Sequence, residues 1–445
     1  MKENDDGSLY RADARFPRSM AVMYLGERGE WRLPPLNGIT TTPLLDDDGT
    51  IRSVAGYDVA TGVWCDGVPD VGRLVPLHPT QKQAAAALLR IRKTFRAFCF
   101  ADAKTVIEAG GPYKGIVCVD TSHPPGQDES SFLAALLTAV CRPRLWLAPG
   151  LAMRGAPFSG SGSGKGKLAR AICTIAFGVA PAALTAGETK EELEKRIAAC
   201  LIEGGPAILL DNMNNMSFKS AQLESAITER PTRVRPLGHS KTVPLCATAM
   251  IILNGNGLSL STDMARRCLT ANFDAGMEDA ETRDFKTDFL AEVREGRLGL
   301  LADMLTIWRW GRQTELKSGK PLGSYEQWGV WVRDPLLALG CADPVEQLLE
   351  GKRRDSAREY VGAIFEKWWV HHKDSPMQTS QLDPDVTHLI DPKDEHGRQY
   401  IASYVARLVG TRPAGFVLTC KPPNTKWGRY TYQMQEVEPH SGAMV

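Results

Sequence analysis

The sequence contains no CxxC pair and no cysteine and histidine group at zinc-site spacing, although it has ten cysteines in 445 residues. Reduced thiols in a cytoplasmic protein are the simpler interpretation. The first residues are acidic where a signal peptide needs basic and apolar ones, so no export is expected. Apolar runs such as 247–253 fall far short of the ~20 residues of a membrane helix, so no membrane association is predicted.

An excess of either charge is also missing, because 53 Lys and Arg residues balance 52 Asp and Glu residues at a net charge of +1. With 43% apolar and 24% charged residues, this composition excludes a disordered tail or a histone-like protein coated with positive charge. Any nucleic-acid-binding surface must therefore be local. At roughly 150 residues per domain, the length suggests about three structural units.

Composition and hydrophobic periodicity divide the chain into five regions. The first is rich in Gly, Pro, Thr and Val and carries turn signals, which indicates short strands and hairpins. The second is helical, with helices expected over 80–97 and 129–141, and the fourth is helical with tryptophans assigned to core or interdomain packing. The predicted regions are 1–76, 77–143, 144–280, 281–350 and 351–445.

The third region alternates short apolar runs with amphipathic helices, which predicts an α/β fold with a parallel sheet covered on both faces. The expected strands are 151–154, 182–184, 207–210, 249–254 and 269–273. The expected helices are 166–177, 189–202, 218–228 and 263–268. A predicted hairpin, 232–236 paired with 242–245, interrupts this alternation.

A glycine-rich loop connects the first of these strands to the first helix. Glycines allow backbone N–H groups to turn toward a phosphate, the helix N-terminus adds positive field, and Lys165 reaches the β and γ phosphates. Ser159 replaces the first Gly of the strict motif, and Gly166 replaces the Ser or Thr that usually binds magnesium. A flexible Gly/Ser linker is the alternative, but a linker does not sit between a strand and an amphipathic helix. The candidate phosphate-binding residues are Gly160, Ser161, Gly162, Ser163, Gly164, Lys165, Gly166 and Lys167.

The apolar strand 207–210 ends in Asp211, as in a Walker B strand, where the carboxylate holds magnesium directly or through water. A capping acid at a strand end is the alternative, and Lys165 upstream weakens it. The next residue is Asn212, where a Glu that polarises the attacking water is usual. An amide cannot accept a proton, so either another carboxylate is the base or Asn212 only positions water and turnover is slow.

Two more features follow in the chain: strand 249–254 leads into Asn254 and Asn256, and a short helix carries Arg266 and Arg267. The four elements in this order, with the sequence from Thr262 to Asp279, resemble the AAA+ ATPases of phages, plasmids and integrated elements related to replicative helicases. The likeness covers roughly residues 40 to 430. Its further matching segments are 43–62, 98–103 and 324–340.

The resemblance implies ATP and Mg²⁺ as cofactors and a homo-oligomeric ring, most simply a hexamer. It implies that Asn254, or failing it Asn256, contacts the γ-phosphate or the attacking water. It also implies that Arg266 or Arg267 points into the nucleotide of a neighbouring subunit, with a surface salt bridge as the alternative. The hairpin is similar to one that projects into the pore of such rings. Its tip residues His239 and Lys241 are then expected to follow the DNA backbone, unless it is an ordinary surface hairpin.

The stretch from His396 to Gln435 contains six basic residues and no acid. A helix over 398–409 followed by strands over 415–420 and 429–432 describes a winged helix, which binds either DNA or protein. The candidate DNA-binding residues here are Arg398, Arg407, Lys421, Lys426 and Arg429.

The sequence therefore predicts a cytoplasmic, ring-forming AAA+ ATPase with a β-rich N-terminal region and a C-terminal winged helix. The expected function is that of an ATP-dependent DNA helicase or translocase in the replication of mobile or phage DNA. A nucleotide-switched DNA-binding protein or loader with weak hydrolysis is the alternative, favoured by Gly166 and Asn212. A primase is disfavoured because zinc-binding cysteines and a clear acidic cluster are missing, so priming would need a partner.

Overall fold

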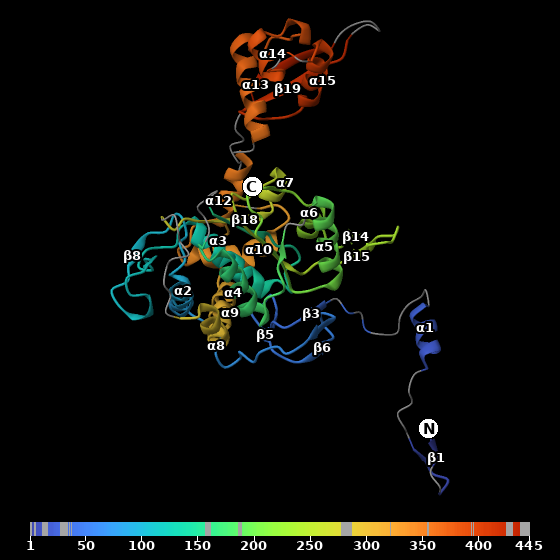
Figure 1. Ribbon diagram of the computed structural model, residues 1–445, viewed down its shortest axis with the longest axis vertical. Coiled ribbons are helices and arrows are strands. Elements are labelled where there is room, and N and C mark those ends of the chain that lie inside the picture. The colour runs from blue at the N-terminus through green and yellow to red at the C-terminus, as the bar shows by residue number, and fades with distance from the viewer. Residues whose placement is uncertain are drawn as a thin grey trace.

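The computed structural model describes residues 2–3, 6–10, 17–26, 34, 36, 38–155, 162–185, 189–276, 287–320, 322–353, 356–392, 394, 396–423 and 430–436. Buried apolar side chains form one large core between Leu45 and Leu348 and a second core between Ile364 and Met434. Figure 1 shows the second unit, in orange to red, apart from the main body. The C-terminal segment therefore has a hydrophobic core of its own.

A five-stranded sheet forms the centre of the main body, and all of its strand pairs are parallel. This confirms the predicted α/β class and parallel sheet. In spatial order the strands are β11 (Leu184–Thr185), β12 (Ala207–Asp211), β16 (Met250–Asn256), β10 (Gly150–Gly155) and β18 (Cys268–Phe273).

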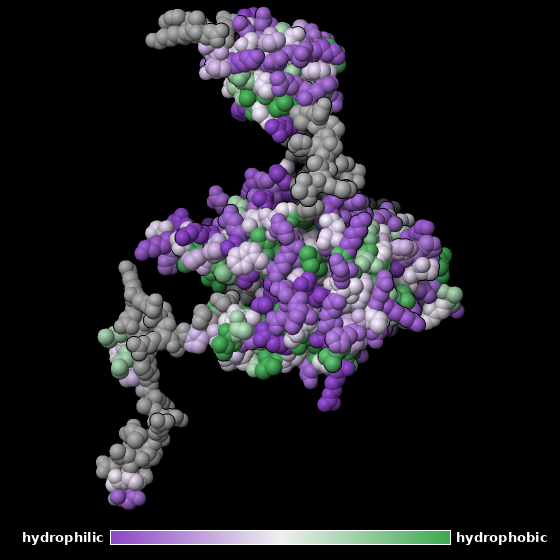
Figure 2. Space-filling model, turned by 180° about the vertical axis from the view of Figure 1, so that it is seen from behind, coloured by the Kyte–Doolittle hydropathy of each residue, from purple (hydrophilic) through white to green (hydrophobic). Residues whose placement is uncertain are grey.

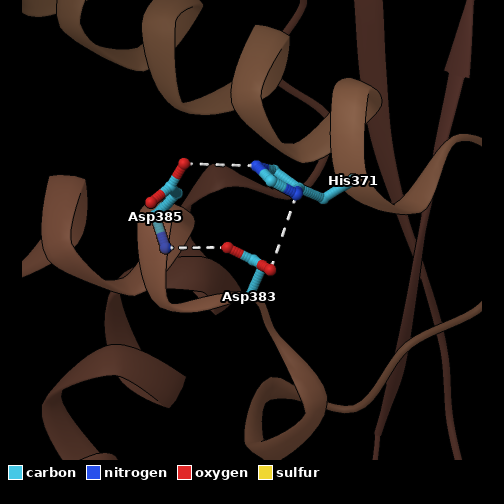
Figure 3. Close-up of side chains that lie close together, drawn as sticks. All are labelled: His371, Asp383 and Asp385. Atoms are coloured by element: carbon cyan, nitrogen blue, oxygen red, sulfur yellow. Dashed lines mark hydrogen bonds and ion pairs between the residues drawn. The ribbon is translucent and has the colours of Figure 1, made fainter.

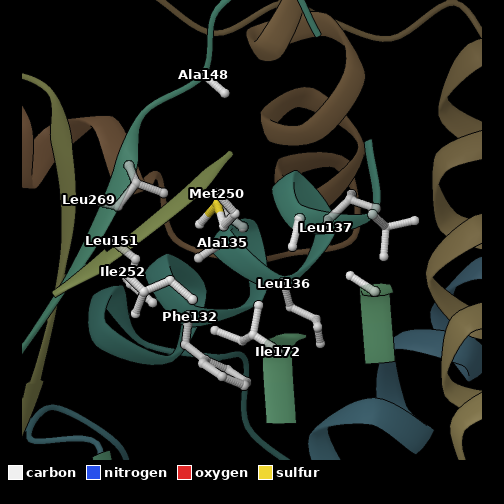
Figure 4. Close-up of a cluster of buried hydrophobic side chains, with 14 of the residues drawn as sticks. Phe132, Ala135, Leu136, Leu137, Ala148, Leu151, Ile172, Met250, Ile252 and Leu269 are labelled. Atoms are coloured by element: carbon white, nitrogen blue, oxygen red, sulfur yellow. The ribbon is translucent and has the colours of Figure 1, made fainter. Parts of the chain in front are cut away.

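Helices cover both faces of this sheet, because the chain crosses it in opposite directions between β10 and β11 and between β11 and β12. α3 (Gln127–Cys141) and α4 (Lys165–Phe177) pack together, and α5 (Lys190–Glu203) packs with α6 (Ala221–Thr228). Figure 4 shows side chains of α3 and α4 meeting those of β10, β16 and β18, among them Phe132, Ile172 and Leu151.

Two predicted helices were too long. The Ser220 hydroxyl accepts a hydrogen bond from the Leu223 backbone N–H at 3.2 Å, so α6 begins after it, and Phe218 lies instead in β13 (Ser217–Phe218). α7 spans only Thr262–Ala265 before β18 begins, and β17 is Ser259–Leu260. The local sequence indicated helix here, but pairing of 268–273 with β10 in the sheet decided the end of α7.

The helix that follows the glycine-rich loop is fixed at its C-terminal end by distant residues. The Thr41 and Thr42 hydroxyls donate to the carbonyls of Phe177 and Ala176, each at 2.9 Å, and Arg297 Nε donates to the Thr174 carbonyl at 3.0 Å. The last carbonyls of a helix have no partner within it, so these bonds stabilise the end of α4. The position of α4 is therefore set by the N-terminal and helical regions together.

The N-terminal region contains short strands, as its composition predicted, and one helix that was not expected, α1 (Arg18–Gly26). β3, β7 and β6 form a three-stranded sheet. The strands are β1 (Lys2–Glu3), β2 (Leu9–Tyr10), β3 (Gly38–Thr40), β4 (Leu44–Leu45), β5 (Ile51–Arg52), β6 (Gly56–Asp58) and β7 (Val63–Cys65).

Helices and a hairpin complete the main body. The Thr80 hydroxyl caps α2 (Gln81–Phe95). The elements before the sheet are β8 (Thr105–Ile107), η1 (Gly111–Tyr113) and β9 (Val117–Val119). Those after it are α8 (Phe289–Glu295), α9 (Arg297–Gln313), α10 (Glu326–Trp328), η3 (Gly329–Arg333), α11 (Asp334–Ala338) and α12 (Pro344–Arg353). The rings of Trp308, Trp310, Trp328 and Trp331 are buried, which confirms their predicted packing role.

The C-terminal unit consists of helices and one antiparallel hairpin around Trp368. The imidazole of His371 bridges Asp383, 3.5 Å from Nδ1, and Asp385, 3.3 Å from Nε2, as Figure 3 shows. This network joins α13 to the first turn of α14. The elements are α13 (Ser356–His372), η4 (Thr379–Gln381), α14 (Pro384–Ile390), α15 (Arg398–Leu408), β19 (Phe416–Lys421) and β20 (Thr431–Glu436).

The surface of the described residues carries both hydrophilic and apolar side chains. On the face shown in Figure 2, hydrophilic residues dominate and apolar residues lie scattered between them. Among the helices that the structure describes, none has the length and apolar character required to cross a membrane. The ten cysteines all lie within the described residues, and they are thiols rather than disulfides.

Candidate functional site

The candidate site lies at the carboxyl edge of the parallel sheet, where β10, β16 and β12 end side by side. The sheet order places β16 between the strand that feeds the glycine-rich loop and the strand that ends in Asp211. The carboxyl ends of parallel strands share one edge, so Lys165, Asp211 and Asn254 come together around one cleft. Three of the predicted elements thus form one site.

The described part of the glycine-rich loop depends on left-handed backbone. Gly162 and Gly164 have φ values of 71° and 87°, which favour glycine. A Cβ on Gly164 would lie 2.7 Å from the ring of Phe98, so the loop also packs too closely for a side chain. The N-terminus of α4, which no side chain among the described residues caps, carries the positive end of the helix dipole. Gly160 and Ser161 lie outside the described residues.

Lys165 is the buried cation of the site. Its Nζ donates to the Ser163 hydroxyl and to the Asn256 side-chain carbonyl, each at 2.7 Å. Burial lowers the pKa of Lys165 to about 8. Phosphate oxygens in the cleft would favour the ammonium form and compete for its hydrogen bonds.

Amide side chains form part of the cleft lining. Asn254 is 3% exposed, and its Oδ1 accepts a hydrogen bond from the Asn212 backbone N–H at 3.3 Å. Its Nδ2 is buried without a partner among the described residues, so this donor can bind an acceptor that enters the cleft. Asn212 has a φ of 58°, a conformation that asparagine tolerates better than most residues. The backbone therefore gives a reason for Asn in a position where Glu is usual.

Asp211, the one residue predicted to hold magnesium, lines the cleft next to an arginine. Position 166 has no hydroxyl, and the Asp211 carboxylate lies 3.7 Å from Nη2 of Arg170. Arg170 Nη1 also donates to the Gly166 carbonyl at 3.2 Å. A guanidinium therefore lies beside the one carboxylate that was predicted to hold magnesium, and residues 166 and 211 do not form the usual pair of protein ligands for that ion.

Two hollows adjoin at the loop. The first, about 310 Å³, is the cleft itself, and its described lining includes three cations, Lys165, Lys167 and Arg170, against one acid, Asp211. The second, about 80 Å³, shares Gly162, Gly164 and Lys167 with the cleft and is mostly apolar. Its lining includes Phe98, Tyr113 and Phe289. A positive cleft beside an aromatic hollow suits a molecule with phosphates at one end and a flat ring at the other.

The two arginines predicted to act between subunits lie away from this cleft. Arg266 and Arg267 pair with Asp263 at 3.0 and 3.6 Å. The Arg267 carbonyl accepts from the Gly150 N–H, which places it at the amino end of β10, the opposite edge of the sheet from the loop. At about 3.3 Å per residue, the six-residue strand separates the edges by roughly 20 Å.

The predicted hairpin is present as β14 (Thr232–Val234) and β15 (Val243–Leu245), which pair antiparallel. It projects from the main body in Figure 1. Its strands are shorter than predicted, because 235–242 form the connecting loop. His239 and Lys241 are exposed in that loop.

The basic residues of the C-terminal unit do not share one surface. Arg398 and Arg407 are exposed on α15, and nine positions at about 100° per residue place them about 180° apart. Arg398 borders a hollow of about 620 Å³ that includes Gln399 and Tyr430, whereas the Arg407 guanidinium lies 5.4 Å from the centre of the Tyr404 ring. Lys421 is exposed at the end of β19. Lys426 and Arg429 lie outside the described residues.

Sequence reasoning missed three contributors to the site: Arg170, Asn214 and Phe98. Asn214 lines the cleft, and its Oδ1 accepts from the Asn256 N–H at 2.7 Å. Phe98 arrives from a distant segment that joins the sheet edge, where Phe100 bridges to Phe273. Only Arg170 had a detectable signal, because it lies one helical turn after Gly166.

No family model matches the sequence, and no curated protein matches it. Among solved structures, the A-form apo structure of the NrS-1 C-terminal region is similar at 12% sequence identity and a TM-score of 0.40. The similarity covers 86% of this chain and 84% of that chain. A likeness of this extent assigns no function.

Proposed function

We propose that this protein is an ATP-binding motor of the AAA+ type that acts on DNA, as a helicase or translocase in the replication of mobile or phage DNA. The observation that carries the proposal is the meeting of Lys165, Asp211 and Asn254 at one edge of a parallel sheet, beside the N-terminus of α4. Cations, helix N–H groups and a buried amide donor all suit a triphosphate. The aromatic hollow beside the loop suits the base.

In this proposal the chain's residues have separate tasks. Lys165 binds the β and γ phosphates, and Asn254 Nδ2 donates to the γ-phosphate or orients the attacking water. Arg266 or Arg267 stabilises phosphoryl charge on a neighbouring subunit of a ring, most simply a hexamer. Their position at the opposite sheet edge supports action between subunits, because they cannot reach the cleft of their own chain.

Contact with DNA is assigned to two elements. The exposed Lys241 on the projecting hairpin would follow the backbone of DNA in the ring's pore. The C-terminal unit would bind DNA as a winged helix, with α15 followed by the β19–β20 hairpin. A primase would then be a separate partner.

A nucleotide-switched DNA-binding protein or loader is the second candidate, and Asn212 favours it. An amide cannot accept a proton from water, and the left-handed backbone at this position disfavours the longer Glu. ATP would then be bound tightly and hydrolysed slowly, and the bound state would hold DNA.

The test combines DNA-stimulated ATP turnover with strand displacement on a forked substrate. For a motor, Lys165→Ala abolishes both activities, and Lys241→Ala abolishes displacement while DNA binding remains. For a switch, the wild type retains DNA with ATP but displaces no strand. Unchanged ATP affinity in folded Lys165→Ala would reject both candidates.

A further inference from the structure

Arg170 lines the cleft, one helical turn after the end of the glycine-rich loop. Arg170 stands on α4 one turn after Gly166, and its side chain is 41% exposed. Its two terminal nitrogens face different groups: Nη1 lies 3.2 Å from the Gly166 carbonyl, and Nη2 lies 3.7 Å from Asp211 Oδ2. The side chain is therefore held toward the cleft by the loop on one side and by the Walker B carboxylate on the other.

The lack of a side chain at Gly166 leaves space for the guanidinium of Arg170. A Cβ on Gly166 would lie 3.1 Å from Arg170 Nη1 and 3.6 Å from Asp211 Oδ2. Residue 166 is thus directed at Asp211, where a Ser or Thr hydroxyl would share a metal ion with that carboxylate. With glycine there, the guanidinium occupies the space.

A guanidinium can do part of the work of a divalent cation. It is always charged, and its five donors form a rigid fork that binds a carboxylate and a phosphate oxygen at the same time. We infer that Arg170 takes the place of the divalent cation between Asp211 and a bound triphosphate, so that triphosphate binding by this protein does not require magnesium. The inference rests on the proposed nucleotide site and concerns how that site neutralises the phosphates.

An exposed salt bridge of no functional consequence is the alternative, and it makes a different prediction. A pair at 3.7 Å with an exposed partner contributes little to stability. If that were its whole role, loss of Arg170 would leave nucleotide binding and its metal dependence unchanged.

The experiment is calorimetric titration of the full-length protein with a non-hydrolysable ATP analogue, once with excess MgCl₂ and once with excess EDTA. The wild type should bind in both, with dissociation constants within about tenfold of each other. Arg170→Ala should weaken binding in EDTA by more than about tenfold and binding in MgCl₂ by much less. Gly166→Ser, which adds a hydroxyl near Asp211 and crowds the guanidinium, should also make binding metal-dependent. Arg196→Ala is the matched control, because Arg196 is an exposed arginine on α5 paired with Glu192.

The outcomes separate the two proposals. Wild-type binding that disappears in EDTA, or an Arg170→Ala protein with the wild-type ratio of the two constants, overturns the role of Arg170 and leaves the nucleotide site intact. Wild-type protein that binds the analogue in neither buffer overturns the nucleotide site itself. Thermal unfolding of each variant shows whether a loss of binding is a loss of fold.

Discussion

At the scale of single residues, Lys165 shows how burial adjusts a binding group. Lys165 is 7% exposed, and burial lowers its pKa to about 8. In the proposed nucleotide site, bound phosphates would favour the charged form and raise this pKa, so binding would take up protons near pH 8. The expected affinity for ATP is highest below that pH, where Lys165 is already charged, and it falls as the pH rises above it.

We therefore predict that the affinity for ATP falls between about pH 8 and pH 9.5, by up to about tenfold per pH unit. Calorimetry in two buffers of different ionisation enthalpy should show the accompanying proton uptake. Lys165→Arg keeps its charge throughout this range, so its affinity, though lower, should stay constant with pH. An equal slope in that variant would assign the titration to another group.

At the scale of elements, the cleft depends on a close approach between β16 and the segment after β12. The Met213 N–H donates to the Asn254 carbonyl at 2.9 Å, and a Cβ on Gly255 would lie 2.3 Å from the Met213 carbonyl oxygen. The amides of the cleft are positioned by this contact. A larger residue at 255 must push the two segments apart.

Gly255→Ala is therefore predicted to lower the free energy of unfolding by about 1–3 kcal/mol and to weaken ATP binding. Denaturant unfolding and nucleotide titration measure the two effects. Gly299→Ala is the control, because no atom beyond the backbone of its own helix, α9, lies within 4 Å of the position that a Cβ would take, and alanine favours helix. Equal free energies of unfolding for the two variants would show that β16 can move away from the segment after β12 without loss of stability.

The terminal helix α15 yields a second prediction at this scale. Arg398 and Arg407 lie on opposite faces of α15, so one duplex cannot use both in the same way. Arg398 borders the hollow with Gln399 and Tyr430, whereas Arg407 lies over Tyr404. We expect Arg398→Ala to lower the salt slope of DNA binding by about one, and Arg407→Ala to leave it unchanged. A lower salt slope for Arg407→Ala with an unchanged slope for Arg398→Ala would instead place the DNA on the face of α15 that carries Arg407.

At the scale of the whole molecule, the predicted arginines and the cleft lie at opposite edges of the sheet. In the proposed ring, the arginines of one chain would therefore act on the cleft of a neighbouring chain. We predict that an Arg266/Arg267 double alanine variant and a Lys165→Ala variant, each inactive alone, recover ATP hydrolysis when mixed. The recovery should depend on the mixing ratio, because only interfaces with an intact cleft and an intact arginine are active. If mixed oligomers form but ATP hydrolysis does not recover, these arginines do not take part in catalysis.

The sequence by itself determined the local features of this protein. Apolar runs and glycine signals were sufficient to predict β10, β12, β16 and α4, because strand and helix periodicity are properties of neighbouring residues. Lys165 and Asp211 followed from their positions after these strands.

Only the tertiary structure decided which residues meet. The strand order that places β16 between β10 and β12, the packing of Phe98 on Gly164 and the approach of Arg170 to Asp211 all join segments far apart in the chain or on different elements. Asn212, with its left-handed backbone, directly precedes Met213, whose N–H donates to the Asn254 carbonyl of a different strand. Such contacts depend on how whole elements pack, and local sequence does not encode that packing residue by residue.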